Sequence, residues 1–236
     1  MSGVSARIWH WYSGDQAMSA STFAWMAKDL EAAPPPPSVD EAQRGLISTE
    51  VAYRRHTSFS VASVMASGAL LEASINELVA SAAHSNLAVG GDRDDASRRK
   101  LCRAAEALDR MGSLEKYEHV LVLLDLESFD RGRQPFQDVA LVRRLRNALV
   151  HFAPRWREAL AGEESQGFEL ALERKGFRVP PFAGEGNPFF PTKCLGYDCA
   201  AWALRSVLDY VDAFHRRLGV TPGYEAIRSE IESALT

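Results

Sequence analysis

The sequence has no run of about 18 uninterrupted apolar residues, so no membrane-spanning segment is expected. Its N-terminus also lacks the basic cluster and clean apolar run of a signal peptide, because Asp15 and Lys28 interrupt the candidate. There are only three cysteines, Cys102, Cys194 and Cys199, and they form no CxxC pair. This disfavours a disulfide framework or a zinc knuckle, and we expect a cytoplasmic protein with reduced thiols.

Several signatures of common enzymes are also missing. No HExxH or HxxxH pair occurs, and no GxSxG is present. The glycine pair Gly90-Gly91 is not followed by the GK[ST] of a phosphate-binding loop. We therefore expect no metal and no cofactor. The net charge of -4 excludes a strongly basic, nonspecific nucleic-acid binder, so any nucleic-acid site must be a local patch.

Helical periodicity dominates the chain, and the alternation typical of strands is scarce. "SVDE", from Ser38 to Glu41, reads as a capping box, and a helical pattern follows almost unbroken to about residue 85. Its apolar residues recur at spacings of three and four, at Val61, Val64, Met65, Gly68, Leu71, Ile75, Leu78 and Val79. A helix of more than about forty residues is long for a globular domain and favours a bundle or a dimer.

The predicted architecture is an all-α, up-and-down bundle of about five to seven helices, one of them unusually long. Residues 1–37 are interpreted as an N-terminal arm with a proline-rich linker, because four prolines, Pro34 to Pro37, cannot continue a helix. Residues 38–236 form the helical domain. The arm carries Trp9, Trp11 and Trp25, which we expect to be buried on the body or on a partner.

Further helices are expected at residues 96–111, 113–130, 135–152, 155–174 and 197–218, and a short one opens at 221. Gly219 is expected to end the helix over 197–218. The segment 176–196 is rich in Gly, Pro and Phe, and it permits two interpretations. Its phenylalanines fill gaps in the core, or the segment binds a partner.

One stretch, "LVRRLRNALVHFAP" over residues 141–154, combines Arg146, Asn147 and His151 on a predicted helix. At 100° per residue these three side chains lie away from the apolar stripe, with Val150 among them. The apolar stripe consists of Leu141, Val142, Leu145, Ala148, Leu149 and Phe152. A polar face that also carries a valine suggests an interface, and a homodimer through this helix is one simple account.

The charge around this helix differs from that of the whole chain. Residues 131–157 contain seven arginines and one acid, Asp138. Such a patch suits a phosphate backbone, and Arg143, Arg144 and Arg155 are candidate RNA-binding residues. A solvated or salt-bridged face is the alternative.

"RNALVH" resembles the R-(polar)-x-x-x-H signature of the HEPN superfamily, the higher-eukaryote and prokaryote nucleotide-binding domain. "SGALLEASINELV" and "CAAWALRSVLDYVDAFHRRLG" are similar to the long helix and the final helix of its branch associated with RNA-ligase and surveillance proteins. The resemblance covers about residues 38–219. The H-x-Y extension of another branch is missing, because Ala153 occupies that position. Arg144 also fits the looser spacing of the family, but Arg146 is preferred because Asn147 follows it.

The resemblance implies a small helical bundle, commonly dimeric, and in many members a metal-independent endoribonuclease of toxin or defence systems. In that case His151 is the general acid or base, Arg146 stabilises the phosphate transition state, and Asn147 orients the phosphate or the imidazole. Glu72 and Asn76, four residues apart, are expected to form a buried polar pair that supports the site. RNA, a second copy and an antitoxin are the implied partners.

Two other functions stay open. Members that have lost catalysis serve as dimerisation or nucleotide- or RNA-binding modules, and this chain could be one of them. Alternatively, the protein is a helical interaction scaffold outside the superfamily, in which the N-terminal arm and the Phe-rich segment bind partners.

Overall fold

The structure, a computed structural model, describes residues 11–36, 50–83, 95–153, 163–184 and 186–236. Within these ranges the fold is all-helical and contains no strand, which confirms the predicted all-α bundle with one long helix. The helical segments are more numerous than five to seven because several are short. They are α1 Ser13–Ala32, α3 Glu50–Ala83, α4 Asp95–Asp109, α5 Ser113–Leu123, α6 Phe136–Val150, α7 Glu163–Glu173, η1 Phe189–Lys193, α8 Tyr197–Leu218, η2 Glu225–Ile227 and α9 Arg228–Ser233.

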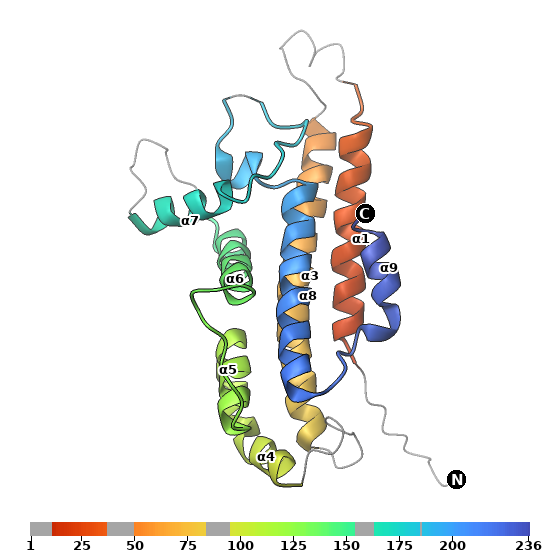
Figure 1. Ribbon diagram of the computed structural model, residues 1–236. Coiled ribbons are helices and arrows are strands. Elements are labelled where there is room, and N and C mark those ends of the chain that lie inside the picture. Colours follow the sequence, from red (N-terminus) through yellow and green to blue (C-terminus); the bar gives the residue numbers. More distant parts are fainter. Residues whose placement is uncertain (1–10, 37–49, 84–94, 154–162, 185) are drawn as a thin grey trace, which may run out of the picture.

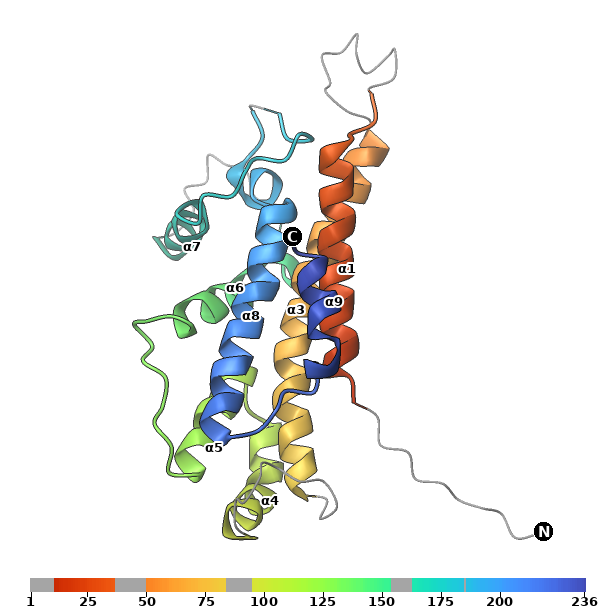
Figure 2. The ribbon, with the colours of Figure 1, turned by 45° about the vertical axis from the view of Figure 1, so that its right-hand side comes forward.

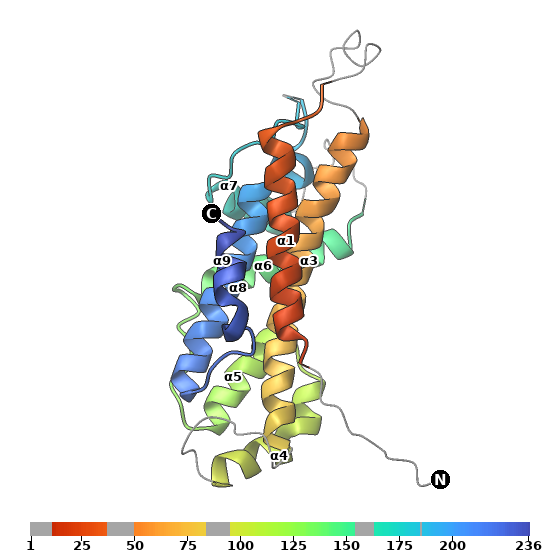
Figure 3. The same ribbon diagram turned by 90° about the vertical axis from the view of Figure 1, so that its right-hand side faces the viewer.

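Three long helices, α1, α3 and α8, pack side by side; α3 and α8 run in the same direction, and α1 runs antiparallel to both (Figures 1 and 2). The directions therefore do not alternate strictly as the predicted up-and-down order would require. Helix α9 lies along α1 on the outside of this layer (Figure 3). Helices α4 and α5 pack near one end of the bundle, and α7 lies toward the other end (Figure 1). Helix α6 differs from the expected topology, because it crosses the bundle axis instead of running along it (Figures 1 and 2).

The contact between α1 and α3 is made of small residues. One face of α1 is an alanine stripe at spacings of three and four, and all its members are fully buried: Ala17, Ala20, Ala24 and Ala27. The facing part of α3 contributes buried serines, and Ser63 Oγ donates to the Ala20 carbonyl at 2.8 Å. Because these side chains are short, the two backbones approach closely and bury each other's polar and apolar surface.

Helix α1 comes from the predicted N-terminal arm, and it docks on the body, against α3 and α8. It ends at Ala32, ahead of the prolines, as expected. Trp11 and Trp25 are 40% and 51% exposed, so the body does not bury them, and burial on a partner stays a prediction. Both tryptophans lie outside the alanine stripe, which provides the buried face of α1. Trp9, the 37/38 boundary and the capping box lie outside the described residues.

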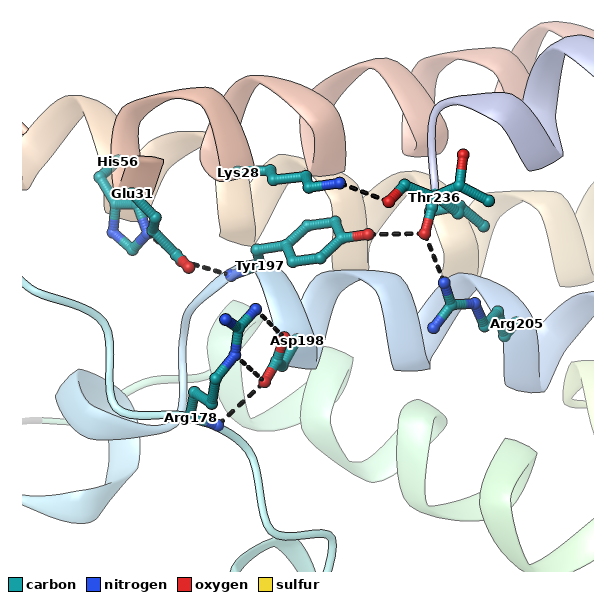
Figure 4. A network of polar contacts seen from close by, with 9 residues as sticks. Lys28, Glu31, His56, Arg178, Tyr197, Asp198, Arg205 and Thr236 are labelled. Carbon is teal, nitrogen blue, oxygen red and sulfur yellow. Dashed lines mark hydrogen bonds and ion pairs between the residues drawn. The ribbon is translucent and has the colours of Figure 1, made fainter. Parts of the chain in front are cut away.

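A carboxylate joins the three long helices at one end. Glu31 of α1 accepts a hydrogen bond from His56 Nε2 of α3 at 2.8 Å and another from the backbone N–H of Tyr197 at 2.6 Å (Figure 4). Tyr197 is the first residue of α8, so Glu31 satisfies one of the donors that a helix N-terminus leaves free. The Phe182 ring stacks on His56 with 4.6 Å between ring centroids.

Two further groups of polar contacts lie on either side of Tyr197 (Figure 4). Arg178 donates to Asp198 through Nε and Nη2 at 3.0 Å each, and the guanidinium lowers the pKa of that carboxyl. On the other side, Lys28 Nζ donates to the Thr236 carbonyl at 2.6 Å, and Tyr197 Oη donates to the Leu235 carbonyl at 2.6 Å. The first turn of α8 is therefore attached both to the segment that precedes it and to residues 235–236.

The Phe-rich segment 176–196 contributes side chains to the core. Phe182 is buried, and Phe177, Phe189 and Phe190 are half-buried against the main cluster. This packing supports the first of the two interpretations of the segment.

Several helix boundaries differ from those predicted. Helix α5 ends at Leu123 instead of near residue 130, and α6 ends at Val150, two residues early. Gly219 adopts φ 67° and ends α8 in the left-handed conformation, as its position predicts. By length and composition α3 could span a membrane, although half of its most apolar window is buried in the bundle, and core helices meet the same criteria.

The alanine stripe predicts that the buried face of α1 tolerates larger side chains much less well than its exposed face. We expect Ala20→Leu to lower the free energy of unfolding by about 1–3 kcal/mol, because its extra carbons have no space against α3. Thr22→Leu on the exposed side of the same helix is the matched control, with an expected change within about 0.5 kcal/mol. Urea unfolding followed by circular dichroism measures both, and equal effects would contradict close packing of α1 on α3.

Candidate functional site

A cleft of about 540 Å³ lies where α6 crosses α3. Helix α3 and helix α6 supply most of its polar groups, and the start of α5 and the region around the first turn of α1 close its ends. The polar side chains that line it are Tyr12, Gln16, Glu72, Asn76, Ser113, Arg143, Arg146 and Asn147. A cleft of this size and polarity fits a small ligand or a short segment of a polymer.

Gly68 determines where the Arg146 side chain lies. A Cβ at this glycine would be 3.2 Å from Arg146 Cγ, so the missing side chain leaves room for the arginine stem against α3. Val142 and Leu145 anchor the other face of α6 in the core. The guanidinium then reaches the cleft, where its Nη1 donates to Asn147 Oδ1 at 3.1 Å.

The predicted orientation of the motif requires a correction. Arg146, Asn147 and His151 are exposed, as the helical wheel indicates. Yet Arg146 and Asn147 do not point away from their own bundle, because both line the cleft shared with α3. The physical reason is the crossing geometry, which places the polar flank of α6 over α3 instead of over solvent.

Glu72 and Asn76 line the same cleft as Arg146. They are not the buried pair that was expected, because Asn76 is exposed and Glu72 is half-buried. Both accept hydrogen bonds from Lys116 Nζ of α5, at 3.2 Å from Glu72 Oε1 and 2.8 Å from Asn76 Oδ1. The lysine is only 3% exposed, so these two acceptors compensate most of the cost of burying its charge.

Lys116 was not predicted to be buried, because "EKYEH" over residues 115–119 has the composition of a surface segment. In the structure Lys116 and Tyr117 are both buried. Tyr117 Oη donates to the Leu71 carbonyl at 2.9 Å, and burial raises the pKa of this phenol. The signal that could have revealed it is the spacing of Leu114, Tyr117 and Leu121, which gives α5 an inward face bordering on Lys116.

The arginines of residues 131–157 divide into two groups. Two of them form salt bridges, which agrees with the alternative interpretation of the charge patch as a salt-bridged face. Arg131 Nε and Nη2 donate to Glu118 at 3.0 and 2.5 Å, and Arg133 Nε lies 3.3 Å from Asp130. Their positive charges are therefore largely offset locally.

The arginines of α6 form the second group. Among the described residues, Arg143, Arg144 and Arg146 have no carboxylate within salt-bridge distance. Arg143 and Arg146 line the cleft, whereas Arg144 lies over the Phe168 ring of α7, 5.4 Å from its centroid. This placement separates Arg144 from Arg146 and puts only Arg146 beside Asn147. Arg155 lies outside the described residues.

His151 is the residue that follows α6, and its backbone N–H donates to the Asn147 carbonyl at 2.9 Å. Its side chain is exposed and is not among those lining the cleft. The structure thus gathers Arg146, Asn147, Glu72 and Asn76 and leaves His151 one turn farther along α6. Phe152 was expected in the core but is 51% exposed, because the helix ends before it.

Within the described ranges, no group of three or more His, Cys, Asp and Glu side chains could hold a metal ion. Comparisons with protein-family models, curated proteins and solved structures gave no significant match. Membership in the HEPN superfamily therefore rests on the motif over residues 146–151 and its helical setting, and it stays a prediction.

Because Lys116 is buried, we expect removal of its two acceptors to destabilise the protein more than removal of the lysine itself. We expect the double variant Glu72→Ala/Asn76→Ala to lose about 1–3 kcal/mol of unfolding free energy, because it leaves a buried ammonium without acceptors. Lys116→Met should cost less, because the two acceptors then turn to solvent and an apolar chain of similar length fills the space. Denaturant unfolding of wild type and the two variants measures these free energies. A larger loss of unfolding free energy for Lys116→Met than for the double variant would contradict this account.

Proposed function

We propose that this protein binds RNA through the cleft between α3 and α6. The observation that carries the proposal is the set of α6 arginines without carboxylate partners, two of which line the same cleft as Asn147. A guanidinium offers a planar fork of donors that matches the oxygens of a phosphate. In a chain of net charge -4, these arginines form the local positive patch that a polyanion requires.

The other lining groups favour a nucleic acid over a free phosphate. Asn147 supplies an amide, and Glu72 adds a carboxylate within the same cleft. Such groups can contact base edges and the ribose 2′-hydroxyl, which DNA lacks. Tyr12, exposed at the rim, adds an aromatic face for an unpaired base. We therefore propose a single-stranded stretch of RNA as the ligand.

The binding test uses fluorescence anisotropy with a labelled single-stranded RNA. We expect Arg146→Ala to weaken binding by about ten- to a hundredfold, since a charge-assisted hydrogen bond contributes roughly 1.5–3 kcal/mol. The slope of log K against log salt concentration should also fall by about 0.7, as for one lost phosphate contact on a single strand.

Arg54→Ala serves as the matched control, because Arg54 is exposed at the start of α3 and pairs with Glu50. It removes the same charge far from the cleft and should leave the affinity within about twofold of wild type. Equal losses in both variants would indicate a diffuse charge effect and would contradict binding in the cleft.

Metal-independent RNA cleavage is the second candidate function, and it rests on the resemblance of the motif over residues 146–151. The His151 imidazole is exposed, and the His151 backbone lies one turn beyond Asn147. In the proposed step a base removes the 2′-hydroxyl proton, and O2′ bonds to phosphorus. The bond to the 5′-oxygen breaks, and an acid protonates that oxygen, leaving a 2′,3′-cyclic phosphate and a 5′-hydroxyl. Arg146 stabilises the extra charge on phosphorus.

The step needs an acid and a base, and one chain contributes a single histidine to the motif. A homodimer through α6 would bring a second His151 to the site, as the resemblance implies. A toxin or defence effector controlled by an antitoxin is the setting that we propose for such an activity, with the cytoplasm as its location.

The cleavage test uses RNA and protein treated with EDTA. We expect wild type to cleave and His151→Ala to lose at least about a hundredfold in rate while still binding RNA, because proton transfer contributes about 10²–10⁴-fold. His119→Ala is the matched control, since His119 is an exposed helical histidine on α5. Cleavage that survives in His151→Ala, or that requires a divalent metal, would remove this candidate and leave RNA binding as the function.

A further inference from the structure

A second cavity, of about 310 Å³, lies on the other side of α3. Helix geometry separates it from the cleft, because Glu77 and Ser81 project from α3 on the flank opposite Glu72 and Asn76. Helix α8 and the segment after it complete the wall. The lining residues are Trp11, Ser74, Glu77, Leu78, Ser81, His215, Val220, Thr221 and Gly223.

The first polar group of this cavity is the Glu77 carboxylate. Its Oε1 accepts the backbone N–H groups of Tyr12 at 2.5 Å and Ser13 at 2.7 Å, which fixes the side chain at the start of α1. Its Oε2 lies beside Gly223, where an added Cβ would be 3.4 Å away. Because Gly223 lines the cavity, this second oxygen is the one available to a bound molecule.

The second polar group is the His215 imidazole of α8. Nδ1 lies 2.9 Å from the Val211 carbonyl, an acceptor, so Nδ1 carries the proton and Nε2 is left with a lone pair. The side chain is 5% exposed, and burial lowers its pKa, which keeps the ring neutral at pH 7. His215 therefore offers the cavity a hydrogen-bond acceptor.

Hydroxyl groups and apolar groups form the rest of the wall, and the hydroxyls are those of Ser74, Ser81 and Thr221. Leu78 and Val220 supply aliphatic surface, and Trp11 supplies an aromatic ring at the mouth. No lysine or arginine is among the residues that line the cavity. The cavity thus combines a carboxylate, a neutral imidazole acceptor, several hydroxyls and an aromatic face, without a cation.

We propose that this cavity binds a small organic amine in its protonated form. The ammonium group lies against Glu77 Oε2 and donates to His215 Nε2, and the hydrocarbon or aromatic body lies against Leu78 and Trp11. An aromatic face attracts a cation as well as an apolar surface.

Other ligand classes fit these residues less well. A carboxylate or phosphate would meet the Glu77 charge with no cation to offset it. A structural metal site uses about four ligands, and this cavity supplies only Glu77 and His215 as strong ones. A purely apolar molecule would displace water from both polar groups without replacing its hydrogen bonds.

The experiment compares phenethylamine with 2-phenylethanol, a neutral molecule of nearly the same shape, by isothermal titration calorimetry on the full chain. We expect the amine to bind with a dissociation constant in the micromolar to low millimolar range. The alcohol should bind at least about tenfold more weakly, because it lacks the charge that pairs with Glu77.

Glu77→Gln is the decisive variant. The glutamine carbonyl still accepts the two backbone N–H groups at the start of α1, so the fold is retained while the charge is lost. We expect this variant to bind the amine and the alcohol about equally. Glu106→Gln, at an exposed position on α4, should keep the wild-type preference. Trp11→Ala should weaken both ligands, since it removes the wall shared by their rings.

Three results would overturn the proposal: equal affinity of wild type for the two molecules, an unchanged amine preference in Glu77→Gln, or no binding of the amine at millimolar concentration. The RNA proposal is tested separately, since Arg146 and Arg143 stay intact in every variant used and the anisotropy assay with labelled RNA can be repeated on Glu77→Gln.

Discussion

The close approach of α1 to α3 is the constraint on which the rest of the structure depends. The side chains of the alanine stripe of α1 are small enough for the two backbones to lie close together. Ser63 of α3 then donates a hydrogen bond to the Ala20 carbonyl across this contact. Once the two helices are this close, α8 packs against both and completes the three-helix layer. Large side chains of α1 have no space on this face and lie on the exposed face, as Trp25 does.

The cleft arises from a second close approach, between α6 and α3. Gly68 lets the Arg146 stem lie on the long helix, and the buried stripe of α6 holds the crossing in place. Lys116 then adds a positive charge behind Glu72, which orients a carboxylate within an otherwise cationic site. A cleft with both signs of charge is suited to discriminate among polar ligands as well as to attract phosphate.

Local patterns predicted much of the fold. The period of α8 and its end at Gly219 follow from residues adjacent in sequence. The all-α class and the long helix are likewise visible in the spacing of apolar residues. The orientation of Arg146 was not predictable, because a helical wheel assumes a core on one side and cannot show that α6 crosses α3. The burial of Lys116 was not predictable for a related reason, since its acceptors lie some 40 residues earlier in the chain.

The polar contacts that Glu31 and Lys28 make with residues of α8 and of the last turn have a consequence for the kinetics of folding. The contact between Glu31 and Tyr197 joins residues 166 positions apart, and that between Lys28 and Thr236 spans 208. Helix α1 can meet α3 early, because they are neighbours along the chain. Its end is fastened only after α8 has formed, and non-local contacts of this kind slow folding because loop closure must precede their gain. The bundle should therefore fold more slowly than its all-helical composition suggests, with the α1–α8 junction among the last contacts to form.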